Sequence, residues 1–97
     1  MSRLLAFVNI FVESPTLDDV VQALSQFSNV EELYEVTGEY DIVALVSAAS
    51  IEEFREFLKY KILKIKGVRS TVTSVVFNAP KERVRRIRQG ASTGIDG

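Results

Sequence analysis

A single carboxylate stands beside the central turn of this sequence. Asp41 follows Gly38 by three positions and directly precedes the apolar run 42–46. Because glycine adopts positive φ angles at little cost, Gly38 is the expected reversal point of a β-hairpin. Aspartate is unfavourable in strands and is seldom buried without a partner, so Asp41 is a candidate binding residue. The structural alternative is an edge aspartate that faces water or hydrogen-bonds the turn.

Two hydroxyl groups are expected near this carboxylate. Thr71 and Thr73 lie at the start of the last apolar segment, and strand alternation places them on the same sheet face as Asp41. Asp41 would bind an ammonium group, while the hydroxyls and the backbone N–H groups near Gly38 would bind a carboxylate. This residue set suits a small zwitterion. Threonine is also a common strand residue, which is the structural explanation for each one taken alone.

The remaining composition favours a binding domain over an enzyme. The 97 residues contain no histidine and no cysteine, which removes the usual general base, the commonest metal ligand and thiol chemistry. The sequence has no Gly-rich phosphate loop and no nucleophile with a neighbouring base. We therefore expect no catalytic residue, no metal and no cofactor.

The charge is divided unevenly along the chain. Residues 1–80 carry seven basic and eleven acidic side chains, whereas residues 81–97 carry five basic and two acidic ones. We expect a folded domain over 1–80 and a basic, flexible tail over 81–97. An acidic domain is a poor match for nucleic acid, so no direct sequence-specific DNA binding is expected. Without a signal-peptide pattern or an apolar run of ~20 residues, we expect a cytoplasmic protein with no membrane partner.

Periodicity and turn residues divide the segment 4–78 into strands and helices. The patterns predict strands at 4–12, 30–37, 40–47 and 69–78, and helices at 17–27 and 51–66. Thr16 with Asp19, and Ser50 with Glu53, have the spacing of capping boxes at the helix starts. The order β-α-β-β-α-β indicates an α+β ferredoxin-like sandwich. In that topology the third strand lies between the first and second, and the fourth flanks the first.

Both helices should cover one face of this sheet and leave the other face apolar. If Val72 and Val76 of the last strand face the helices, the opposite face presents Leu5, Phe7, Phe11, Val43, Leu45, Val75 and Phe77. An apolar face of this size is seldom left in water, which favours a homodimer formed sheet to sheet, that is, a dimeric α/β barrel. The alternative is a strand register that is wrong by one residue.

Residues 37–42, together with 51–58, 65–68 and 71–73, resemble the effector-binding domain of the Lrp/AsnC transcriptional regulators, also called the RAM domain. The resemblance implies dimers that form larger oligomers such as tetramers or octamers. It also implies a small effector, usually an amino acid, bound between dimers. By the same resemblance, the hairpin with Gly38, Tyr40 and Asp41 contributes to the ligand site. The hydroxyl groups would come from the last strand, at Ser70, Thr71 and Thr73.

Full-length members of that family carry an N-terminal helix-turn-helix domain, whereas the first strand here begins within a few residues of Met1. The expectation is therefore a stand-alone form that senses an effector itself, or that co-assembles with a full-length Lrp/AsnC regulator and modulates it. Three alternatives stay open: an ACT-like regulatory module, a ligand-free oligomerisation module, and a small dimeric α/β-barrel monooxygenase or isomerase. Asn9, a polar residue on the open face, is the argument for the enzyme.

Overall fold

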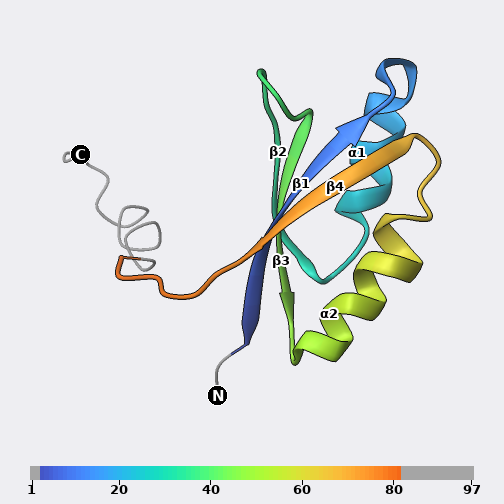
Figure 1. The fold of residues 1–97 in the computed structure, drawn as a ribbon. Helices are drawn as coiled ribbons and strands as arrows, with labels where there is room; N and C mark the ends of the chain where they lie inside the picture. Colours follow the sequence, from blue (N-terminus) through green and yellow to red (C-terminus); the bar gives the residue numbers. More distant parts are fainter. Residues whose placement is uncertain (1–2, 82–97) are drawn as a thin grey trace.

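The structure, a computed structural model, describes residues 3–81. Its elements are β1 (Leu4–Val12), the 3-10 turn η1 (Ser14–Thr16), α1 (Leu17–Ser25), β2 (Val30–Glu35), β3 (Ile42–Ala48), α2 (Ile51–Phe57), the π-helical turn η2 (Leu58–Ile62) and β4 (Val68–Val75). The strands form one antiparallel sheet in the order β2-β3-β1-β4. Figure 1 shows α1 and α2 together on one side of this sheet. The predicted ferredoxin-like topology is confirmed.

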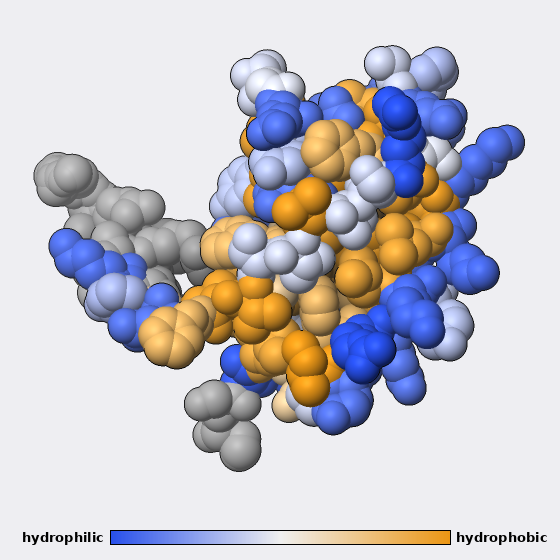
Figure 2. All heavy atoms as spheres, in the orientation of Figure 1, coloured by the Kyte–Doolittle hydropathy of each residue, from blue (hydrophilic) through white to orange (hydrophobic). Residues whose placement is uncertain are grey.

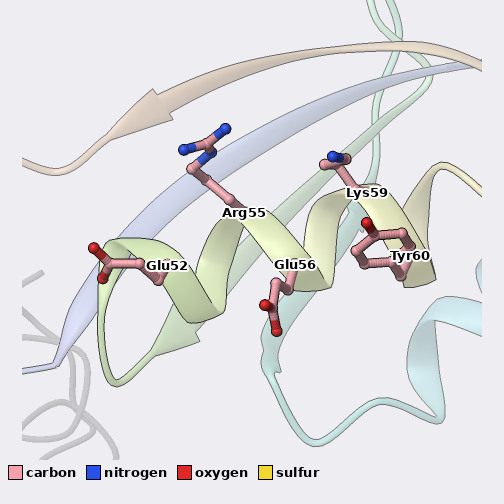
Figure 3. Close-up of a pocket in the computed structure, with 5 residues that line it drawn as sticks. All are labelled: Glu52, Arg55, Glu56, Lys59 and Tyr60. Carbon is pink, nitrogen blue, oxygen red and sulfur yellow. The ribbon is translucent and has the colours of Figure 1, made fainter.

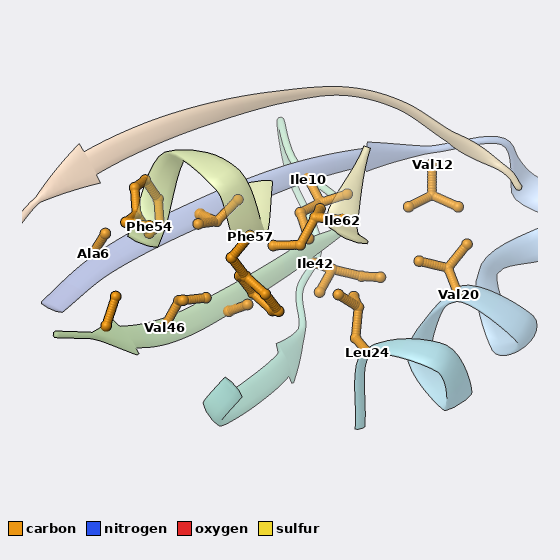
Figure 4. Close-up of a cluster of buried hydrophobic side chains, with 13 residues drawn as sticks. Ala6, Ile10, Val12, Val20, Leu24, Ile42, Val46, Phe54, Phe57 and Ile62 are labelled. Atoms are coloured by element: carbon orange, nitrogen blue, oxygen red, sulfur yellow. The ribbon is translucent and has the colours of Figure 1, made fainter. Parts of the chain in front are cut away.

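The central strand β1 alternates between the two faces of the sheet. Ala6, Val8 and Ile10 are fully buried beneath the helices, whereas Phe7 on the other face is 41% exposed. The helices contribute side chains to the same core, which Figure 4 shows between the sheet and the helical layer. The core consists of Ala6, Val8, Ile10, Val12, Val20, Leu24, Ile42, Ala44, Val46, Ala48, Phe54, Phe57 and Ile62.

The second helix is shorter than the pattern predicts, and its last turn is wider. The α-helix ends at Phe57 and continues as η2 only to Ile62, where the N–H of Leu63 donates to the carbonyl of Leu58 at 2.9 Å. Ile62 is five positions after Phe57. In a regular α-helix, side chains five positions apart point to different faces. The π-helical turn brings both side chains into the core. Ile51, which the predicted apolar stripe included, is instead 44% exposed.

The two predicted capping boxes differ in outcome. The hydroxyl of Ser50 accepts the N–H of Glu53 at 3.1 Å, as predicted for the start of α2. Thr16 makes no side-chain cap for α1, and its hydroxyl donates to the carbonyl of Glu13 at 2.7 Å. The prediction for Thr16 is wrong because the preceding 3-10 turn gives this residue φ −105° and ψ 7°, outside the extended conformation of an N-cap.

The hairpin loop between β2 and β3 is longer than predicted. β2 ends at Glu35 and β3 begins at Ile42, so the loop covers residues 36–41. Asp41 therefore belongs to the loop rather than to the strand. The last strand also ends earlier than predicted, at Val75, which places Phe77 beyond it.

The faces of β4 are the reverse of the prediction. The ladder with β1 pairs Ala6 with Val75, Val8 with Thr73 and Ile10 with Thr71. Directly paired residues share a face, so Thr71, Thr73 and Val75 lie on the helix side, while Val72 lies on the open side and is 46% exposed. Val76 follows the alternation of Val72. Both faces of β4 carry β-branched residues, so the hydropathy pattern does not indicate which face is buried. The register is decided by the pairing of β4 with the buried residues of β1.

Candidate functional site

The hairpin loop is joined to β1 through Asp41. The carboxylate Oδ2 of Asp41 accepts the backbone N–H of Val12 at 2.8 Å, and this bond is partly buried. The N–H of Asp41 donates to the carbonyl of Ile10 at 3.1 Å, and its carbonyl accepts the N–H of Val36 at 3.0 Å. Two of these bonds join Asp41 to β1, and the third joins it to Val36 on the other side of the loop. The carboxylate has a structural role that neither sequence alternative described, because its partner is in β1 and not in the turn.

The rest of the loop combines a free tip with an anchored base. Gly38 has φ +116°, and a Cβ atom added there would meet no atom within 4 Å. Glycine is thus favoured at this position by the backbone angle alone, as the turn prediction stated. At the base, the ring of Tyr40 contacts the ring of Phe11 with centroids 5.1 Å apart and planes tilted by 58°. This contact fixes the loop beside the open face of the sheet.

The starts of β3 and β4 lie at the same end of the sheet. Ile10 of β1 pairs with Ile42 of β3 on one side and with Thr71 of β4 on the other. The predicted approach of the hairpin to the start of the last strand is therefore correct along the strand direction. The two segments flank β1, and one strand width separates each from it.

The faces of the sheet separate the predicted hydroxyl groups. Ser70 pairs with Phe11 and shares the open face with it. Asp41 lies in the loop beside that same point of β1, where its carboxylate accepts the N–H of Val12. Thr71, by contrast, lies on the helix side. Of the hydroxyl residues proposed from the sequence, Ser70 is the one on the face of Phe11, whose ring Tyr40 contacts, and Thr71 and Thr73 are not.

This arrangement can bind a zwitterion with groups from two directions. An ionised carboxylate has two oxygens and several acceptor positions, so the bond to Val12 leaves Asp41 acceptor capacity for an ammonium group. The hydroxyl of Ser70 and the backbone N–H groups of the loop are donors for a carboxylate. The aromatic pair Phe11 and Tyr40 supplies an apolar surface at this end of the sheet.

The open face of the sheet extends from this site along β1 and β3. We define it by the residues that the strand pairing places away from the helices: Leu5, Phe7, Asn9, Phe11, Glu32, Tyr34, Val43, Leu45, Ser47, Ser70, Val72 and Ser74. Asn9 is its polar residue on β1, and its side-chain amide donates to the carbonyl of Val72 at 3.2 Å. The amide is thereby used within the sheet, which weakens the argument that it serves an active site.

Two open hollows lie elsewhere, on the outer surface of the second helix. Their volumes are about 220 and 260 Å³, below the usual range for small-molecule pockets. The first is lined by Glu52, Arg55, Glu56, Lys59 and Tyr60, and Figure 3 shows that all of these side chains come from the continuous helix α2–η2. Lys59 lies over the Tyr60 ring at 5.3 Å from its centroid. This is a solvated helix face with charges of both signs, and no predicted site residue lines either hollow.

Comparison with known proteins gives a family. The model of the Lrp/AsnC ligand-binding domain matches residues 5–86. An uncharacterised helix-turn-helix-type transcriptional regulator of Pyrococcus horikoshii, PH0140, is 32% identical over 85 residues, which cover 88% of this chain and 54% of the relative. The chain thus spans about half the length of the curated relatives it matches. The relatives are transcription regulators and not enzymes.

Solved structures show the same fold. The protein TTHA0845 of Thermus thermophilus has a TM-score of 0.75 and 36% identity, with 78% of this chain and 95% of that chain covered. The feast or famine regulatory protein Rv3291c of M. tuberculosis, solved in complex with L-methionine, has a TM-score of 0.69 and 32% identity. That match covers 78% of this chain and 51% of the other.

Among the helices of residues 3–81, none has the length and apolar character of a membrane span.

Proposed function

Because the chain belongs to the family of Lrp/AsnC ligand-binding domains, we propose that it is a regulatory domain that binds an amino acid at the end of its sheet. The observation that carries the proposal is the position of Asp41, a carboxylate held by Val12 on the loop that borders the open face. The similar mycobacterial regulator that was solved with L-methionine supports an amino acid as the class of effector.

The recognition follows from the groups around the loop. Asp41 accepts the ammonium group of the effector, and the hydroxyl of Ser70 with loop N–H groups donates to its carboxylate. The ring pair Phe11 and Tyr40 contacts the effector side chain. Because Val12 already holds one oxygen of Asp41, little side-chain entropy is lost when the effector binds.

Binding is coupled to assembly in this proposal. The open face pairs with that of a second copy, so the dimer has helices on the outside and the site lies at the rim of the paired sheets. A second subunit then closes a site that one chain leaves open to solvent. A ligand that binds only the assembled state stabilises that state by mass action. The effector therefore changes the size of the oligomer, or it changes how the domain assembles with a full-length regulator and so modulates that regulator.

The test is a titration of the full chain with each standard amino acid, followed by thermal unfolding and by sedimentation velocity. At least one amino acid should raise the unfolding midpoint and shift the distribution of oligomers. The decisive variant is Asp41→Asn, which keeps an oxygen for the N–H of Val12 and removes the charge. Loss of a charged hydrogen bond, worth about 1.5–3 kcal/mol, weakens binding by about 10- to 150-fold.

Glu39→Gln is the matched control, because Glu39 is an exposed carboxylate in the same loop and the variant makes the same charge change. Its affinity should equal that of the parent chain. If no standard amino acid changes either the midpoint or the sedimentation, the domain is an oligomerisation module without an effector. If both variants weaken binding equally, the loop charge acts as a whole and Asp41 is not the ligand.

A further inference from the structure

We propose that residues 76–81 form an arm that contacts a second copy of the chain, with Phe77 packed against the second copy's open face. The inference rests on the sheet-to-sheet dimer of the proposed function and adds a segment that stabilises it. The side chain of Phe77 is 99% exposed, more than any other large hydrophobic residue that the structure describes.

The arm begins where the sheet ends. The last strand stops at Val75, and the N–H of Val76 donates to the carbonyl of Leu5 at 2.8 Å. Beyond this bond the chain leaves the body of the domain on the side opposite the helices, as the orange segment in Figure 1 shows. Phe77 lies on this departing segment and, at this exposure, contributes nothing to the core of its own chain.

An apolar surface is continuous from the open face to the base of the arm. By the register of β1 and β4, Leu5 lies opposite Val76, and Phe7 lies one pair further along the open face. Figure 2 shows hydrophobic side chains that extend from the domain onto the start of the departing segment. A partner that covers the open face must also meet this segment.

The length of the arm fits a second copy of the same chain. Packed sheets lie about 10 Å apart. Phe77 lies one ~3.8 Å step beyond Val76, within the space between two packed sheets, and the four further residues to Lys81 can extend up to ~14 Å, which is enough to reach the second sheet. In a two-fold dimer each arm would make the same contact, and both Phe77 rings would be buried together. The arm points away from its own sheet, which excludes the same contact within one chain.

A tryptophan at the tip of the arm reports this burial directly, because the chain contains no tryptophan. In Phe77→Trp the emission should be blue-shifted and protected from acrylamide at concentrations where the chain is dimeric. It should become exposed on dilution to the monomer. Tyr60→Trp is the control, since Tyr60 is 57% exposed on the opposite layer and should stay exposed throughout. A reporter that is exposed in the dimer, or buried at every concentration, overturns the arm.

Affinity measurements separate the arm from the dimer itself. Phe77→Ala should raise the dimer dissociation constant at least about tenfold, with an unchanged circular dichroism spectrum, and Phe77→Leu should recover part of the loss. Phe7→Asp places a charge in the middle of the open face and should abolish the dimer. A parent-like dissociation constant for Phe77→Ala beside a monomeric Phe7→Asp rejects the arm alone. A dimeric Phe7→Asp rejects the sheet-to-sheet dimer on which the arm depends.

Discussion

The Oδ2 atom of Asp41 lies 2.8 Å from the backbone nitrogen of Val12, 29 positions away in the sequence. The bond ties the hairpin loop to the central strand, at the point where β1 deviates from regular pairing with β4. The residue proposed to bind the effector is therefore also part of the fold. A substitution at this position has two effects, and the two can be separated by the choice of residue.

Replacement of Asp41 by alanine should destabilise the domain as well as abolish effector binding. The variant leaves the N–H of Val12 without its charged acceptor, which costs about 1.5–3 kcal/mol of unfolding free energy. Asp41→Asn retains an acceptor and should lose less than half of that. Urea denaturation measures both, and Glu39→Ala, in the same loop, should lie within about 0.5 kcal/mol of the parent. Equal stability of the Ala and Asn variants would contradict a structural role for this bond.

The hydroxyl groups of β4 should differ in their effect on effector binding. Ser70→Ala removes a donor on the open face and should weaken binding by about 3- to 10-fold, the usual range for a neutral hydrogen bond. Thr73→Val preserves the shape of a side chain on the helix side and should leave the affinity unchanged. Calorimetric titration of both variants checks the assignment. A weaker affinity only for Thr73→Val would mean that the effector lies on the helix side.

The two glycines with positive φ should tolerate alanine unequally. Gly38 has φ +116° and open space around it, so Gly38→Ala costs only the backbone strain of about 1–3 kcal/mol. At Gly67, with φ +104°, a Cβ would overlap the side chain of Thr16 at the start of α1. Gly67→Ala should therefore cost about 1–3 kcal/mol more than Gly38→Ala, measured by chemical denaturation. Similar losses would show that Thr16 moves aside freely.

Apolar residues of the open face should control assembly, whereas an apolar residue with a similar exposed fraction on the helical layer should not. Phe7 is 41% exposed on β1 and Ile51 is 44% exposed at the start of α2. Phe7→Asp should give a monomer in sedimentation velocity, because the charge lies in the centre of the proposed interface. Ile51→Asp should sediment as the parent does. A change of oligomeric state only in Ile51→Asp would place the interface on the helical layer.

Part of the proposed site could be derived from the sequence because it depends on local rules. A turn that needs a positive φ identifies Gly38 without any knowledge of the neighbours, and the spacing of Ser50 and Glu53 predicts the cap that the structure has. The same kind of rule failed for Thr16, since the turn before the helix changed its backbone angles. The expected tail over 81–97 lies outside the described residues except for Lys81, so it stays a prediction.

The sequence by itself determined the order of the elements, the central place of β1 and the family. These follow from hydrophobic periodicity and turn residues, which act over a few positions of the chain. Tertiary structure alone decided which side of the sheet Thr71, Thr73 and Val75 occupy, and which N–H Asp41 accepts. A strand with β-branched residues on both faces carries no signal for its orientation. Its register is set by the neighbouring strand, whose buried residues admit only one alignment against the helices.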